Sequence, residues 1–101
     1  MNIFDISNLP LTEELTEILI QNKNVRIERI ISSGQVSPDG FWYDQDENEF
    51  VVLLQGDAII EYENDRIKLE SGDTLLIPAH KKHRVSYTSI KPVCVWLCIF
   101  Y

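Results

Sequence analysis

The chain has 101 residues, of which 45% are hydrophobic, and a formal net charge of −7 at pH 7. This length corresponds to one domain that can bury a single core without cross-links. No Lys/Arg cluster is larger than Lys81-Lys82, and nucleic-acid binders and proteins held at anionic membranes usually show a basic face. We therefore expect neither a nucleic acid nor a membrane as a partner.

The N-terminal residues M-N-I-F-D-I-S-N lack the basic and apolar regions of a signal peptide. The longest apolar run, Val93 to Tyr101, is too short to span a bilayer as a helix. These features predict a cytoplasmic protein. Cys94 and Cys98 are the only cysteines. In one strand they would lie roughly 13 Å apart, beyond the roughly 7 Å between Cα atoms that a disulfide spans, so we predict two reduced core thiols.

Residues 9–21 have the pattern of an amphipathic helix. The apolar residues that recur at helical spacing are Leu11, Leu15, Ile18 and Leu19. Thr12 can cap the first turn, and the two glutamates that follow it suit the positive end of the helix dipole. We predict a short N-terminal α-helix over about residues 11–21, within an extension formed by residues 1–24. Its polar face places it on the outside of the fold.

From residue 25 onwards the apolar period changes to two, and turn-forming residues recur at short intervals. A turn-rich segment (32–40), a short aromatic segment (41–43) and an acidic loop (44–49) follow the first alternating run. The later predicted strands are Phe50–Leu54, Ala58–Tyr62, Arg66–Leu69, Thr74–Ile77, Arg84–Thr88 and Val93–Tyr101. About eight short strands with no interleaved helix predict an all-β protein, an antiparallel sandwich or barrel.

Two blocks of residues have a spacing that carries more information. Glu49 is followed by six residues and then Gly56, in E-F-V-V-L-L-Q-G. Gly72 is followed by five residues and Pro78, and His83 comes five positions later. Together with F-W-Y-D-Q-D-E-N and P-A-H-K-K-H-R, these blocks resemble small single-domain bacterial cupins, whose motifs are Glu-x6-Gly and Gly-x5-Pro-x-Gly-x2-His-x3-Asn.

The resemblance covers residues 25–101 and implies a double-stranded β-helix, the cupin jelly-roll barrel, with residues 1–101 as one cupin domain. In that family two histidines of the first motif, its glutamate and the histidine of the second motif bind a divalent metal. Glu49 and His83 match this set. The His-x-His pair falls on Trp42 and Asp44 with a four-residue spacer.

With a three-residue spacer the pair falls on Tyr43 and Gln45 instead, so no histidine stands at either alternative. The metal ligands implied by the resemblance are His83 and Glu49 with Asp44 or Gln45. Asp44 is the first choice because its spacer is the commoner family form. Oxygen ligands with one imidazole suit Zn²⁺, Ni²⁺, Mn²⁺ or Fe²⁺ without strong preference.

Strand alternation gives a separate reason to place two of these side chains inside the barrel. His83 shares an apolar face with Val85 and Tyr87, and Glu49 shares one with the apolar residues after it. A buried carboxylate needs a metal, His83 or a substrate cation as its partner. The alternatives are a core histidine satisfied by hydrogen bonds and a Glu49 that lies in solvent at the strand end.

A substrate pocket would have aromatic walls. We predict Tyr43, Tyr87 and Trp96 as these walls, with His80 at the barrel rim in place of the motif glycine. Each aromatic residue could equally be plain core, since aromatic side chains fill small barrels.

These residues support three functions, and the sequence assigns no catalytic residue. The favoured function is a metal-binding cupin with isomerase, decarboxylase or dioxygenase chemistry on a small polar substrate. The second is a metal-free module that binds a sugar or carboxylic acid between Tyr43, Trp96 and His83. The third is a homodimer with an interaction role, paired through the N-terminal helix and the C-terminal strand.

Overall fold

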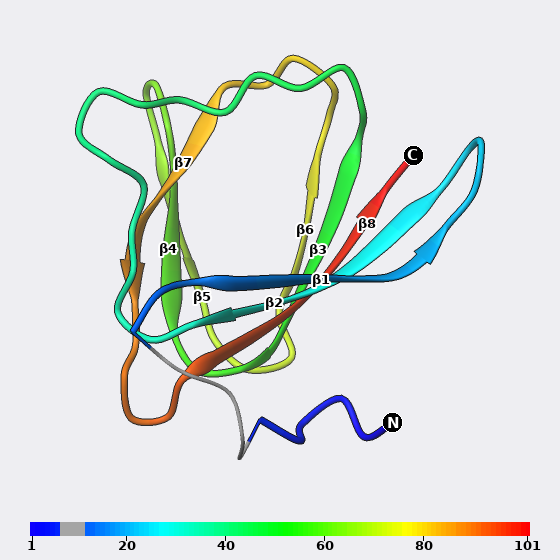
Figure 1. Cartoon of the computed structure of the whole chain (residues 1–101). Coiled ribbons are helices and arrows are strands. Elements are labelled where there is room, and N and C mark those ends of the chain that lie inside the picture. Colours follow the sequence, from blue (N-terminus) through cyan, green and yellow to red (C-terminus); the bar gives the residue numbers. More distant parts are fainter. Residues whose placement is uncertain (7–11) are drawn as a thin grey trace.

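The computed structural model describes residues 1–6 and 12–101, and the regular elements within them are β-strands (Figure 1). In chain order the strands are β1 (Leu15–Gln21), β2 (Arg26–Ser32), β3 (Glu49–Gln55), β4 (Ala58–Tyr62), β5 (Arg66–Leu69), β6 (Thr74–Ile77), β7 (His83–Thr88) and β8 (Cys94–Phe100). These residues contain no helix, and so none that is long and apolar enough to cross a membrane.

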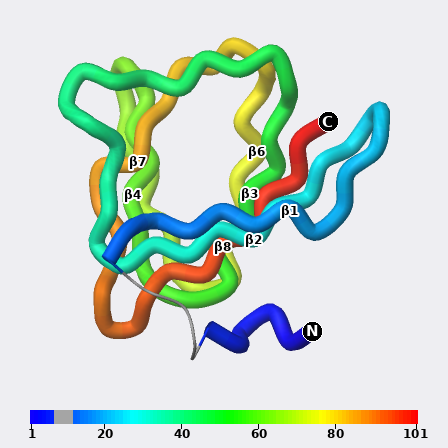
Figure 2. The backbone as a smooth tube through the Cα atoms, in the orientation of Figure 1, coloured from blue at the N-terminus to red at the C-terminus, as the bar shows by residue number. Residues whose placement is uncertain are grey.

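The strands form two antiparallel sheets that enclose a barrel. One sheet has the order β1-β2-β8-β3-β6 and the other has the order β5-β4-β7. Figure 2 shows that β3 and β6 face the smaller sheet across the barrel, while β1, β2 and β8 close a third side. The segment 33–48 crosses the remaining side, where Tyr43 pairs with His83 of β7. The prediction of an all-β antiparallel barrel is confirmed.

The predicted helix over about residues 11–21 is wrong. Residues 12–14 are irregular, Leu15–Gln21 form β1, and residue 11 lies outside the described residues. The register of β1 against β2 shifts between Ile18 and Ile20. A β-bulge changes which residues share a face, so the apolar residues lose the period of two and match helical spacing instead. Pairing with β2 then overrides the local pattern.

Arg29 of β2 is buried on the outer face of the larger sheet, with 4% of its surface exposed. Its guanidinium pairs with Glu17 of β1 and donates to the carbonyl oxygens of Ile3 and Asp5, each at 3.1 Å. A buried charge needs such partners. The N-terminal segment is therefore tied to the outside of the sheet by one side chain.

The apolar core lies inside the barrel and is centred on β8. Alternate residues of β8 point inward and pack against β3, β4 and β6, while both cysteines are buried and free, as predicted. Gly56, in the turn after β3, approaches this core closely. It has a φ of +96°, and a Cβ there would lie 2.8 Å from Ser89 Oγ and 2.9 Å from Cys94 Sγ. The backbone at this turn has no room for a side chain.

Candidate functional site

A cavity of about 280 Å³ lies inside the barrel and is lined by residues of both sheets. Apolar side chains from β3, β4, β6, β7 and β8 form one part of its wall. Polar side chains come from β2, from the residues around the start of β1 and from the segment 33–48, and also from Glu49 of β3 and His83 of β7. A concave, largely apolar space with a few converging polar groups is the usual form of a small-molecule site.

His83, the first residue of β7, is 5% exposed and points into this cavity. Its Nδ1 lies 2.8 Å from the carbonyl oxygen of Lys81, which can only accept, so Nδ1 carries a proton. Its Nε2 lies 3.6 Å from Glu49 Oε1. Burial lowers the pKa of His83, but Glu49 and the Lys81 carbonyl raise it by more, so the net pKa lies above its ordinary value.

Glu49, the first residue of β3, is buried beside this imidazole. The side-chain amide of Gln45 donates to Glu49 Oε1 at 3.2 Å. Cys98 of β8 also lines the cavity. Burial raises the pKa of its thiol well above the ordinary value, and the Glu49 carboxylate raises it further. A raised pKa disfavours the thiolate, which is the reactive form of a cysteine.

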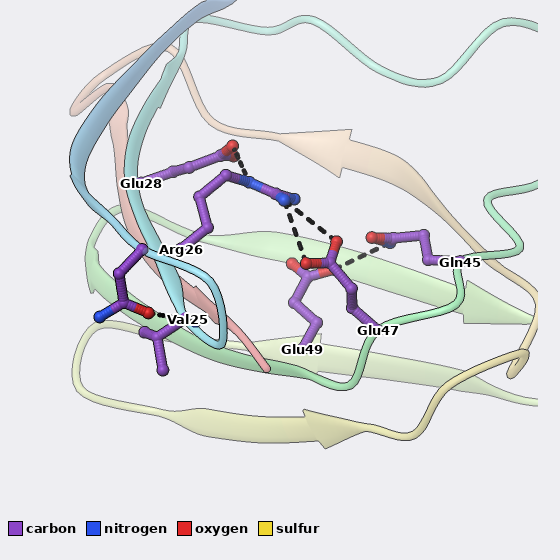
Figure 3. Close-up of polar contacts among 7 residues, drawn as sticks. Val25, Arg26, Glu28, Gln45, Glu47 and Glu49 are labelled. Atoms are coloured by element: carbon purple, nitrogen blue, oxygen red, sulfur yellow. Dashed lines mark hydrogen bonds and ion pairs between the residues drawn. The ribbon is translucent and has the colours of Figure 1, made fainter.

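Arg26 of β2 also lines the cavity, and its guanidinium lies near the carboxylates of Glu47 and Glu49 (Figure 3). Its Nε donates to Glu28 Oε2 at 2.8 Å, and its Nη1 lies 3.1 Å from the Glu47 carboxylate. Its guanidinium carbon lies 4.2 Å from the centre of the Phe100 ring. Partial burial lowers the pKa of Arg26, and the two carboxylates raise it by more. This guanidinium is thus already matched by two carboxylates and one aromatic face.

Glu14 and Ser32 form a second polar part of the wall. Ser32 Oγ donates to Glu14 Oε2 at 3.3 Å and accepts from the indole N–H of Trp96 at 3.1 Å. Burial raises the pKa of Glu14, and the hydrogen bond from Ser32 only partly offsets this. Within residues 1–6 and 12–101 no cation pairs with Glu14. This carboxylate therefore faces the cavity with a hydroxyl as its partner.

Three of the four predicted metal ligands meet in the cavity, and one does not. His83, Glu49 and Gln45 line it together. Asp44 instead lies at the rim, where its Oδ1 is 2.8 Å from His80 Nδ1. His80 is also outside the cavity, with 63% of its side chain exposed and a φ of +62°, so its predicted place in the pocket is not supported. The loop spacing did not indicate which way Asp44 would point.

Of the predicted aromatic walls, Tyr43 and Trp96 line the cavity, and Tyr43 stacks on His83 with ring centres 5.4 Å apart. Tyr87 does not line it and is 47% exposed. The register of β4 against β7 shifts at this point, so Tyr87 pairs with Ile59 while Val85 pairs with the next residue of β4. The resulting bulge turns Tyr87 off the face that His83 and Val85 share.

Sequence reasoning missed the polar wall. The predicted helix over about residues 11–21 places Glu14 on the outside of the fold, and the alternation after residue 25 gives no reason to select Arg26 or Glu28. In the structure their face of β2 points into the barrel, and Ile27 and Ile31 lie on the other face. A usable signal was present, because a strand with one charged face in a barrel must place that face in either solvent or a cavity.

The donor atoms do not fit the four-ligand metal site that the family resemblance implies. Neither candidate position of the His-x-His pair carries an imidazole. Among the residues with described positions, no group of three His, Cys, Asp or Glu side chains could share an ion. The donors that line the cavity near His83 are its Nε2, the Glu49 carboxylate, the amide of Gln45 and the Cys98 thiol, and they lack the two further imidazoles of a Zn²⁺, Ni²⁺, Mn²⁺ or Fe²⁺ site of that kind.

The model of the cupin domain family matches residues 30–100. The chain is a cupin. A solved structure from Ralstonia eutropha JMP134, provisionally assigned as a mannose-6-phosphate isomerase, is 40% identical, covers 99% of this cupin and 94% of its own chain, and superimposes with a TM-score of 0.90.

Two further structures show the same fold. A cupin superfamily protein from Desulfitobacterium hafniense DCB-2 is 25% identical, with a TM-score of 0.77, over 90% of this cupin and 79% of its own chain. A cupin-2 domain protein from Shewanella frigidimarina is 18% identical, with a TM-score of 0.74, over 98% and 91%. Comparison with curated proteins gives no match. The resemblance predicted from the two motif blocks is confirmed.

Proposed function

We propose that this cupin binds a small polar molecule inside the barrel without a resident metal ion. The observation that carries this proposal is the buried His83–Glu49 pair, which faces apolar walls across a cavity of about 280 Å³. That volume is close to the lower end of ligand pockets, which span about 300–1,000 Å³. A ligand of monosaccharide size suits such a space.

The hydrogen bonds around His83 prepare it for a ligand. The Lys81 carbonyl fixes Nδ1 and the Tyr43 ring stacks on the imidazole, so the ring orientation is set before binding. Nε2 and the Glu49 carboxylate then offer a donor and acceptors to a ligand hydroxyl. The same pair can accept or donate a proton, and the provisional assignment of the Ralstonia protein as a sugar-phosphate isomerase supports a sugar-like ligand.

Thermal shift measurements on chelator-treated protein test this proposal. A panel of monosaccharides, amino sugars and small hydroxy compounds should include one that raises the melting temperature by several degrees at saturation, since ligand binding stabilises the folded state. The chelator alone should change nothing. His83→Gln should abolish the shift, and His80→Gln is the matched control because His80 lies exposed at the rim. A melting temperature that falls on chelation would contradict metal-free binding.

Metal binding is the second candidate, and one observation favours it. Nδ1 of His83 is held by a carbonyl while Nε2 faces Glu49, which is how metal-binding histidines are commonly oriented. A bound metal would supply Lewis-acid chemistry of the isomerase, decarboxylase or dioxygenase type. Elemental analysis of tag-free protein purified without chelator decides the point. Close to one metal per chain would replace the metal-free proposal, and a trace amount that Zn²⁺, Ni²⁺, Mn²⁺ or Fe²⁺ does not raise would end the metal hypothesis.

We also propose that this cupin forms a homodimer through β1. This strand is at the sheet edge, has β2 as its one partner among residues 1–6 and 12–101, and exposes Ile18 and Ile20 at 55% each. Unpaired edges with apolar side chains are templates for association. Light scattering should give the mass of a dimer, and Ile18→Glu should shift it toward the monomer. Ile90→Glu is the control, since Ile90 is 61% exposed elsewhere and should change nothing. A wild-type monomer would contradict the proposal.

A further inference from the structure

We propose that the ligand of this cavity is a small organic cation, whose ammonium group binds beside Glu14 and Ser32 and whose apolar part contacts the opposite wall. The same cavity discriminates against phosphate and carboxylate groups. This inference rests on the binding function proposed above and specifies the class of ligand.

The first support is the balance of charge in the cavity wall. Three carboxylates line it, Glu14, Glu28 and Glu49, against one guanidinium and one imidazole. Arg26 is already shared between Glu28 and Glu47, and His83 faces Glu49. Every cation of the wall therefore has a carboxylate partner, while Glu14 has a hydroxyl. The cavity carries an unbalanced negative charge that a cationic ligand would neutralise.

The second support is that the one guanidinium is not free to hold an anion. Arg26 uses its Nε for Glu28 and its Nη1 for Glu47, and its face packs on Phe100. A phosphate that approached Arg26 would come close to both carboxylates at the same time. Charges interact strongly in partly buried sites, where the effective dielectric constant is far below that of water. An anionic ligand is therefore repelled at the place where it would otherwise be anchored.

The third support is the shape of the wall around Glu14. Thr16 and Ser32 add hydroxyl groups beside the carboxylate, and all three line the cavity. Ile60 and Val85 line the same space, and Trp96 presents an aromatic surface there. An ammonium group is favoured by carboxylates, hydroxyls and aromatic faces, whereas the hydrocarbon attached to it is favoured by aliphatic side chains. The cavity wall thus has a polar part for the ammonium group and an apolar part for the hydrocarbon of the same ligand.

Isothermal titration with two matched series of compounds tests this inference. One series is mannosamine, mannose and mannose 6-phosphate, and the other is isoamylamine, isoamyl alcohol and 4-methylpentanoate. In at least one series the amine should bind about tenfold or more tightly than the neutral compound, as expected for a carboxylate at the cavity wall that no cation pairs with among residues 1–6 and 12–101, and the anion should not bind measurably.

An anion that binds as tightly as the amine of its series would overturn the inference and leave the binding function intact. An amine that binds no more tightly than the neutral compound would also overturn the inference and leave the binding function intact. If none of the six compounds binds while a neutral compound of the thermal-shift panel does, the inference fails alone, and if nothing binds in either experiment the proposed binding function fails with it.

Substitutions of single carboxylates test which residue causes the preference for the amine. Glu14→Gln should weaken amine binding by about tenfold and leave the neutral compound unchanged. Glu13→Gln is the matched control, since Glu13 is the adjacent carboxylate and does not line the cavity. Glu47→Gln removes one carboxylate partner of Arg26 and should reduce the difference in affinity between the amine and the anion of each series. Equal amine affinity in wild type and Glu14→Gln, with melting temperatures unchanged, would refute the assignment of Glu14.

Discussion

The substitution Gly56→Ala should destabilise this cupin more than any comparable change at its other turns. Gly56 lies in the turn between β3 and β4 with a φ of +96°. An added Cβ would lie 2.8 Å from Ser89 Oγ, 2.9 Å from Cys94 Sγ and 3.0 Å from Cys94 Cα. Ser89 cannot move away at low cost, because its hydroxyl donates to the Pro92 carbonyl and accepts from the Asp57 amide.

The cost has two parts that a second glycine separates. A non-glycine residue in the left-handed region costs about 1–2 kcal/mol, and overpacking a tight site costs about 1–3 kcal/mol. Gly72 has nearly the same φ, +92°, but nothing lies within 4 Å of an added Cβ. Gly72→Ala should therefore show only the backbone part. Gly56→Ala should lose about 2 kcal/mol more than Gly72→Ala, which corresponds to a melting temperature lower by about 10 °C.

Urea denaturation of wild type and the two variants measures this difference directly, provided that the slope against denaturant stays constant. Both substitutions reduce the conformational entropy of the unfolded chain by the same amount, so this contribution to the free energy of unfolding cancels when the two variants are compared. Equal loss of unfolding free energy at Gly56 and Gly72 would refute the argument from close packing. A larger loss at Gly72 would refute the assigned geometry of both turns.

Three further substitutions probe the buried charges. The raised pKa of His83 means that its stabilising pairing with Glu49 is fully present below the unfolded-state pKa and is lost as pH rises through the folded-state pKa. His83→Gln should therefore lower the free energy of unfolding more at pH 5.5 than at pH 9, and a gap that widens toward alkaline pH in chemical denaturation would contradict this sign. Arg29→Met should cost about 2 kcal/mol, since hydrogen bonds to a charged group and the pair with Glu17 are lost together. Glu17→Gln leaves the buried guanidinium of Arg29 without its carboxylate and should cost at least as much, so a clearly smaller loss in calorimetry would refute the role given to this ion pair.

The barrel strands after residue 48 were predictable because their signals are local. Thr74–Ile77 was predicted with the observed bounds, since a glycine turn precedes it and Pro78 ends it. The N-terminal strand was not predictable in the same way. Its bulge at Ile18–Ile20 disturbs the alternation that identifies a strand, and its partner β2 is a neighbour only in the folded chain.

The candidate site was predictable only where alternation fixed the direction of a side chain. His83 and Glu49 were expected inside and lie there. The bulge before Tyr87 reversed the expected direction of that residue, and no sequence rule places a bulge reliably. Arg26 was missed for a different reason. Which face of β2 points inward depends on how the sheet curves around the cavity, and that is a property of the assembled barrel.

Because β1 lies at the sheet edge, substitutions there can change which ligand the cavity prefers without changing the stability of the barrel core. Glu14, just before β1, and Thr16 help to form the cavity wall, yet in the part of the chain that the structure describes β1 pairs with β2 alone and no β1 residue belongs to the buried core cluster of β3, β4 and β8. Substitutions there can change the charge of the cavity while the core stays packed. A descendant of this cupin could therefore acquire a new ligand through a few changes near its N-terminus, without first acquiring extra stability to tolerate them.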